Sequence, residues 1–160
     1  MPSKNRRDFL VTTVIVAGGL AGCSSQQSDT PQAGSLLFVN NHNLPHSLKI
    51  EIVNVGSRLN MQNNTVVGDA ENIPPSQRKI TASTTLAPGN SEIYADVFSY
   101  EAWYVVNYTV DGRQPQSPTA TFNPAPPNRD YGNFLSIKVY DSGSTTWEVI
   151  STDDTTQIKS

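Results

Sequence analysis

The sequence predicts an all-β protein, an antiparallel β-sandwich of about seven to nine short strands. From Ser35 onward, short runs rich in Val, Ile, Thr, Tyr and Phe are separated roughly every ten residues by clusters of Asn, Asp, Gly and Pro. No window keeps a helical period over about ten residues or more. We therefore expect strands joined by tight turns and almost no helix.

Alternation along these runs predicts the buried faces. Apolar Leu48, Ile50 and Ile52 share one face of the second expected strand, and charged side chains lie opposite. The expected strands are, in chain order, Ser35–Asn40, Ser47–Asn54, Arg78–Leu86, Ser91–Phe98, Trp103–Asp111, Thr119–Asn123, Phe134–Tyr140 and Thr145–Ser151, and Asn64–Val67 could add another short one.

The later strands repeat this alternation. In the strand Trp103–Asp111 the outward face carries an amide and a hydroxyl, Asn107 and Thr109, so the other face should be buried. The residues expected to point inward in the later strands are Tyr104, Val106, Tyr108, Val110, Leu135, Ile137, Val139, Trp147 and Val149.

Turn chemistry separates the strands. Asp111-Gly112 is expected to close a tight turn, because glycine accepts the positive φ that such turns require. Pro88-Gly89 is expected to reverse the chain in the same way.

The segment Gln114–Arg129 contains five prolines. Because proline cannot donate to a central ladder, this segment is expected to be an edge strand flanked by stiff loops.

Residues 1–22 have the layout of an export signal. A basic start is followed by an apolar run of about a dozen residues, well short of the ~20 that span a bilayer. The run from Arg6 and Arg7 to Leu10 resembles the twin-arginine translocation motif. This resemblance implies a receptor-read address, and in that family the passenger crosses the membrane already folded.

The tetrapeptide Leu20-Ala21-Gly22-Cys23 resembles the lipobox of prokaryotic lipoproteins. The resemblance implies that the Cys23 thiol is alkylated by diacylglycerol and that Cys23 becomes the mature N-terminus. Two acyl chains supply the two signals that stable anchoring needs. Cys23 is the only cysteine, so no disulfide is expected. The expected location is the outer face of the cell membrane, with the lipid anchor as the contact with the membrane.

The remaining chain divides into three parts. Residues 23–34 are polar and lack a large apolar side chain, so they are expected to form a flexible linker behind the lipid anchor. Residues 35–152 suit one sandwich domain. Residues 153–160 are expected to form a polar tail.

Several of these features together resemble a family. A first strand ending at Asn40, the pair Pro45-His46 before the next strand, and the run Leu86–Gly89 are similar to the immunoglobulin-like β-sandwich domains of exported archaeal lipoproteins, especially haloarchaeal ones. The resemblance covers about Ser35–Ser151. It implies an immunoglobulin-like fold and says little about function.

Charge and histidine content narrow the function classes. The net charge is −3 and no Lys/Arg cluster is present, which argues against binding to nucleic acid.

The two histidines, His42 and His46, are four residues apart and could share an adventitious divalent metal. A blue-copper site also needs a cysteine thiolate and usually a methionine, but Cys23 is the lipid site. We expect two histidines exposed in a turn, and no metal or cofactor.

Motifs of catalysis are missing from the sequence. There is no Gly-x-Ser-x-Gly elbow, no phosphate-binding loop and no calcium-binding loop, and the carboxylates are scattered. The sequence therefore favours a protein that is not an enzyme. A metal-binding or catalytic sandwich built from residues that meet only in the fold stays a weaker alternative.

Two further features concern the surface. The sequons at Asn63 and Asn107 mark candidate glycosylation sites, with Asn63 favoured because its surroundings are polar and loop-like. Tyr100 and Trp103 belong to an aromatic cluster that is either core or a platform for sugars. We expect a lipid-anchored cell-surface protein that binds or scaffolds a surface protein or glycan. Glycan binding through Tyr100 and Trp103 is the alternative.

Overall fold

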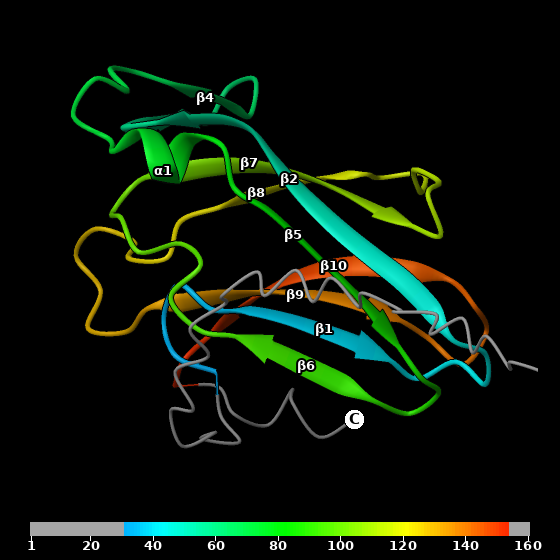
Figure 1. Cartoon of the computed structure of the whole chain (residues 1–160). Helices are drawn as coiled ribbons and strands as arrows, with labels where there is room; N and C mark the ends of the chain where they lie inside the picture. The colour runs from blue at the N-terminus through cyan, green and yellow to red at the C-terminus, as the bar shows by residue number, and fades with distance from the viewer. Residues whose placement is uncertain (1–30, 154–160) are drawn as a thin grey trace, which may run out of the picture.

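The computed structural model describes residues 31–153. Eight strands form two four-stranded sheets that pack as layers, and two more form a hairpin (Figure 1). The predicted all-β class is confirmed, and one short helix, α1 (Pro75–Arg78), interrupts the strands in this part of the chain. The expected export signal with Arg6 and Arg7, the anchor at Cys23 and the tail beyond residue 153 lie outside the described residues.

The first sheet has the strand order β10-β9-β1-β6. Its bounds are β1 (Leu36–Asn40), β6 (Ser91–Tyr94), β9 (Asn133–Val139) and β10 (Thr145–Ser151). The pairings in this sheet are antiparallel except for β1 and β9, which run parallel with Leu36 opposite Leu135. The alternation and turn signals of the sequence did not predict this parallel pair.

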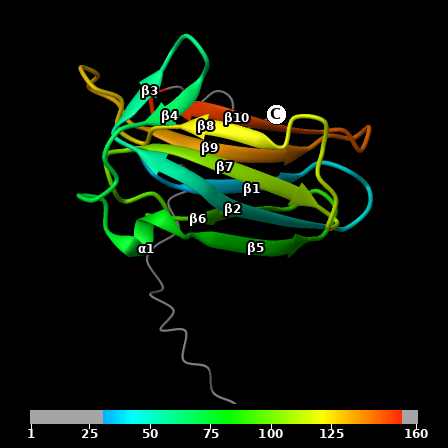
Figure 2. The ribbon, with the colours of Figure 1, turned by 90° about the horizontal axis from the view of Figure 1, so that it is seen from above.

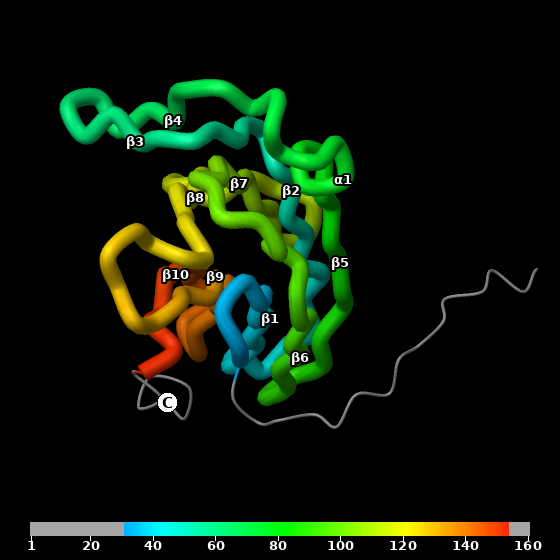
Figure 3. The backbone as a smooth tube through the Cα atoms, turned by 90° about the vertical axis from the view of Figure 1, so that its left-hand side faces the viewer, coloured from blue at the N-terminus to red at the C-terminus, as the bar shows by residue number. Residues whose placement is uncertain are grey.

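The second sheet has the order β5-β2-β7-β8 and is antiparallel throughout. Its bounds are β2 (His46–Gly56), β5 (Thr81–Leu86), β7 (Trp103–Val110) and β8 (Thr119–Phe122). Figure 3 shows the two sheets end-on, with β5 and β6 along the same side of the layers. The proline-rich segment supplies β8 at the edge, as predicted.

Two strands are shorter than predicted. The strand expected at Arg78–Leu86 begins at Thr81, because α1 occupies the preceding residues and a proline suits the first turn of a helix. The strand expected at Ser91–Phe98 ends at Tyr94. The all-β class is unaffected by these differences.

A small hairpin follows β2. It consists of β3 (Arg58–Asn60), which was not predicted, and β4 (Thr65–Val67), which was. Gly56 allows the hairpin to fold back closely, since an added Cβ there would lie 2.7 Å from the Val67 carbonyl oxygen. Figures 2 and 3 show the hairpin projecting from the body of the sandwich.

The main core lies between the sheets and contains most of the residues predicted to point inward. Leu48, Ile50 and Ile52 are buried, as are the inward-facing residues of β9 and all of those of β7 except Val110. Val110 and Trp147 are half-buried and pack against this core. The prediction for Val149 was wrong: it is exposed, while Ile150 is buried. Ile150 packs with Leu37 and Phe134 in a second apolar cluster, because β1 and β9 are central strands that bury residues of both faces.

The sandwich has two different ends. The chain enters near Gly34, whose amide donates to the Asn133 carbonyl at 2.8 Å. The opposite end, which we call the turn end, carries the connections 41–45, 87–90, 111–118 and 140–144. The turn end lies on the right in Figure 1, where β1 ends and β2 begins. Within residues 31–153, no helix is long and apolar enough to cross a membrane.

Candidate functional site

Asn40 holds two connections of the turn end together. Its side chain is fully buried, and its Nδ2 donates to the carbonyl oxygens of Leu44 at 2.9 Å, Leu86 at 3.1 Å and Ala87 at 3.2 Å. Its Oδ1 accepts a hydrogen bond from the His42 amide at 3.0 Å. One side chain therefore shapes the β1–β2 loop, fixes the start of the turn that carries His42, and joins that loop to the β5–β6 connection.

Asn40→Ala is expected to destabilise the protein by about 1–3 kcal/mol, because buried carbonyl groups lose their donor. The matched control is Asn41→Ala, since Asn41 is half-buried and its side chain makes no hydrogen bond within the described chain. That change should alter stability by less than about 0.5 kcal/mol. Urea unfolding of both variants measures the difference, and equal stabilities would show that the Asn40 network contributes nothing.

Asp111 forms the β7–β8 turn predicted from the sequence. Asp111 and Gly112 have φ values of 51° and 73°, and Val110 and Arg113 exchange two backbone hydrogen bonds of 2.9 Å around them. Two positive φ values between paired strands define a type I′ turn. The Asp111 carboxylate is thereby placed beside the start of β2, where its Oδ1 accepts from the Ser47 amide at 2.9 Å.

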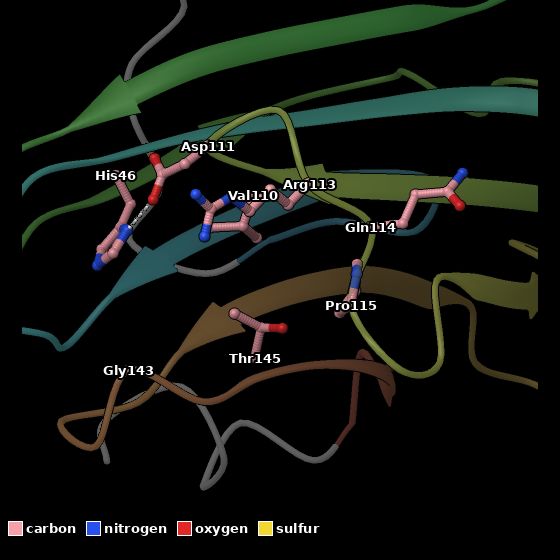
Figure 4. Close-up of a pocket in the computed structure, with 8 residues that line it drawn as sticks. All are labelled: His46, Val110, Asp111, Arg113, Gln114, Pro115, Gly143 and Thr145. Atoms are coloured by element: carbon pink, nitrogen blue, oxygen red, sulfur yellow. Dashed lines mark hydrogen bonds and ion pairs between the residues drawn. The ribbon is translucent and has the colours of Figure 1, made fainter.

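The same carboxylate begins a chain of hydrogen bonds through both histidines. Asp111 Oδ2 lies 2.7 Å from His46 Nδ1, and His46 Nε2 lies 2.7 Å from His42 Nδ1. Figure 4 shows the bond between His46 and Asp111. Because an ionised carboxylate can only accept, His46 donates from Nδ1, and its Nε2 must accept from His42 when both rings are neutral. We therefore assign the Nδ1–H tautomer to both neutral rings.

The pKa of Asp111 is lowered from 3.8, mainly by the hydrogen bond from the Ser47 backbone and then by the bond from His46. A carboxylate with a lower pKa in the folded state contributes stability above its unfolded pKa and loses it as the pH falls through the folded value. The hydrogen bonds to the Asp111 carboxylate therefore stabilise the turn fully above about pH 4, and this stabilisation is lost in stronger acid. Half of the Asp111 side chain is exposed, so solvent reduces this contribution.

A pocket of about 420 Å³ opens beside this chain. Thr145 lies on its floor. Burial raises the pKa of the nearby Tyr108, and a side-chain hydrogen bond with Thr145 has a smaller, opposite effect. In Figure 4 the pocket lies between the β7–β8 connection and the β9–β10 connection, and the Gln114 side chain extends away from His46 and Asp111. The residues lining the pocket are His46, Val110, Asp111, Arg113, Gln114, Pro115, Gly143 and Thr145.

The two histidines are half-buried rather than exposed in a turn. They contact each other, but with Asp111 they form a series and do not converge on one point. No group of three His, Cys, Asp or Glu side chains among residues 31–153 is arranged to hold a metal ion.

The aromatic cluster is mostly core. Phe98, Tyr104 and Phe122 are buried, and Phe98 packs edge-to-face on both other rings at 5.2 and 4.9 Å. Tyr100 is half-buried and packs against this core, and Trp103 is also half-buried. Neither ring is fully exposed, as a flat sugar platform would require, and glycan binding through this pair stays a prediction.

The two sequons differ in accessibility. Asn63 is exposed in the β3–β4 hairpin, and its Oδ1 accepts from the Thr65 hydroxyl at 2.6 Å. Asn107 is half-buried in β7 and accepts from Thr119 on the neighbouring strand at 2.7 Å. The geometry therefore favours Asn63 of the two, and its glycosylation stays a prediction.

Sequence reasoning missed Arg113 and Thr145, and it did not connect Asp111 with His46. The Asp-Gly turn and the histidine at the start of a strand were visible, but their proximity depends on the pairing of β2 with β7. Comparisons of this chain with protein-family models, with curated proteins and with solved structures gave no match.

Proposed function

We propose that this protein is an exported, lipid-anchored module that binds or scaffolds a partner at the outer face of the cell membrane, and that it is not an enzyme. One observation carries the proposal: the chain enters the sandwich at one end, and the pocket lies at the other. Gly34 marks the entry end, and His46, Asp111 and Thr145 mark the turn end.

This arrangement suits an anchor at Cys23. Strand β2 has 11 residues, which at ~3.3 Å each gives the sandwich a length of roughly 35 Å along this strand. A tether of about a dozen residues between Cys23 and β1 would hold the domain from the entry end. The pocket would then face away from the membrane, toward partners outside the cell.

The immunoglobulin-like subclass is part of the proposal. The Tyr104 hydroxyl lies 3.1 Å from the Tyr100 carbonyl oxygen and 3.0 Å from Gln77 Oε1 of α1. A tyrosine near the start of a strand that bonds to backbone a few residues upstream is the tyrosine corner typical of immunoglobulin-like sandwiches. Burial of this hydroxyl raises the Tyr104 pKa to about 12, so it remains a donor at all physiological pH values.

The hydrogen-bond pattern supports a non-enzymatic role. Three of the four ring nitrogens of His42 and His46 are engaged with each other or with Asp111. These bonds position the β1–β2 loop against the β7–β8 turn. The fourth nitrogen, His42 Nε2, faces Gly143, and His42 is not among the residues that line the pocket. A general base must instead present a ring nitrogen to the proton that it removes.

Affinity capture of the full-length protein from its own membranes tests the proposal, with bound partners identified by mass spectrometry. Gln114→Glu at the turn end and Gln62→Glu on the hairpin make the same chemical change at opposite ends. We expect a reproducible partner with the wild type and with Gln62→Glu, and a several-fold lower yield with Gln114→Glu. Equal loss in both variants, or turnover of a substrate by the purified protein, would contradict the proposal.

A further inference from the structure

The pocket wall carries the guanidinium of Arg113. Arg113 follows the Asp111-Gly112 turn and forms no ion pair within 4.0 Å among the described residues. In Figure 4 its side chain extends back toward Asp111 and His46, and its charge helps to lower the Asp111 pKa. A guanidinium donates parallel N–H bonds that match the two oxygens of a carboxylate.

The histidine pair beside it can take up one proton without losing a hydrogen bond. When both rings are neutral, the remaining acceptor of the pair is His42 Nε2. This nitrogen faces Gly143, since it would lie 3.6 Å from a Cβ added to that glycine. A proton there leaves both existing hydrogen bonds in place and strengthens them by adding charge. A second proton, on His46 Nε2, would face the His42 Nδ1 proton across 2.7 Å and break that bond.

The charges around the pair determine what this proton does. Asp111 and Arg113, on the β7–β8 connection, carry opposite charges that balance while both rings are neutral. The β9–β10 connection carries Asp141 at an exposed position, where solvent and salt screen it, and residues 87–90 carry no charge. One proton added to the pair would therefore make the pocket net positive.

We propose that this pocket binds small-molecule carboxylates, held by Arg113 and favoured by the single proton that the His42–His46 pair can take up. The inference rests on the proposed binding function and names the ligand chemistry of its pocket. A volume of about 420 Å³ suits a small organic acid, because small-molecule sites span roughly 300–1,000 Å³. The Thr145 side chain on the floor adds a neutral hydrogen-bonding group for the rest of such a ligand.

Sodium acetate is the probe, titrated into ¹⁵N-labelled full-length protein in nonionic micelles at about pH 6 and about pH 8. NMR of the backbone amides of Arg113, Gln114 and Gly143 should show saturable shifts. Affinity should be about threefold or more higher at the lower pH, the effect of one unit charge ~6 Å from the anion under water-like screening.

Two variants locate the effect. Arg113→Gln should abolish the saturable shifts, whereas Arg129→Gln should not. Arg129 is a matched control, because it lies over Tyr131 at 5.5 Å in the loop before β9, near the entry end. His42→Gln should keep the affinity seen at the higher pH and lose the gain at the lower one.

The proposal is overturned by an absence of saturable shifts, by equal affinity at the two pH values, or by unchanged binding in Arg113→Gln. Equal shifts with sodium chloride at the same ionic strength would also overturn it, by showing general attraction of anions. The titration uses purified protein, so its failure leaves membrane anchoring and partner capture standing. If partner capture fails, the acetate titration still shows whether the pocket binds a carboxylate.

Discussion

Ile137→Ala should lower the free energy of unfolding by about 2–5 kcal/mol, and Ile50→Ala should do the same. Both side chains are fully buried between the sheets. Ile137 pairs with Phe38 on one side and Trp147 on the other, so the neighbouring strands hold the cavity open after truncation. Val106→Ala removes less volume from the same core and should cost somewhat less. Urea unfolding of the purified protein gives the three values.

Val53→Ala is the control for this series. Its side chain is 50% exposed on β2, the strand that also carries Ile50. The change should therefore cost less than about 0.5 kcal/mol. If all three core truncations were as mild as this control, the inward faces assigned to β2, β7 and β9 would be wrong.

Cys23→Ser should move nearly all of the protein from the membrane fraction to the soluble fraction, or stall its processing. In the proposed function the Cys23 thiol is the attachment point of diacylglycerol, and a serine hydroxyl in its place cannot form that thioether. Fractionation with immunoblotting measures the redistribution. Mass spectrometry of the wild type should show a chain that begins at Cys23 with added acyl mass.

Ser24→Ala is the matched control, since it changes the next residue and leaves the thiol intact. This variant should stay at the membrane. A wild-type protein found mainly as a full-length, unlipidated cytosolic species would contradict the anchor. Membrane retention of Cys23→Ser at the wild-type level would show that something other than lipid holds the protein there.

Local rules predicted much of the fold. The alternation of Leu48, Ile50 and Ile52 identified a buried face, because the period of two in a strand leaves one choice of inward side. Asp111-Gly112 identified a tight turn, because glycine accepts the positive φ that such turns require. These signals reside in neighbouring residues, so they can be read without knowledge of strand pairing.

The parts that were missed depend on contacts between distant segments. The parallel pairing of β1 with β9 has no signature in either strand alone. The burial of Ile150 instead of Val149 follows from the position of β9 at the centre of its sheet, which makes both faces of the region apolar.

The candidate site was missed for the same reason. Asp111 meets His46 only because β2 and β7 pair with Leu48 opposite Val110, which sets Ser47 beside the Asp111 turn. His42 joins them because the buried amide of Asn40 accepts its backbone hydrogen bond. The residue types were therefore visible in the sequence, but their register was not.

The parallel pair also sets the order in which the chain can fold. Leu36 pairs with Leu135, so β1 cannot complete its pairing until β9 is present. Almost the whole domain lies between these two strands in the sequence. Contacts between residues so far apart slow folding, because a long loop must close before they form. On the ribosome, β1 can meet only β6 until β9 has been synthesised. The first sheet is therefore completed after translation is nearly finished. A chain that stops before residue 133 leaves the backbone N–H and C=O groups on one edge of β1 unpaired.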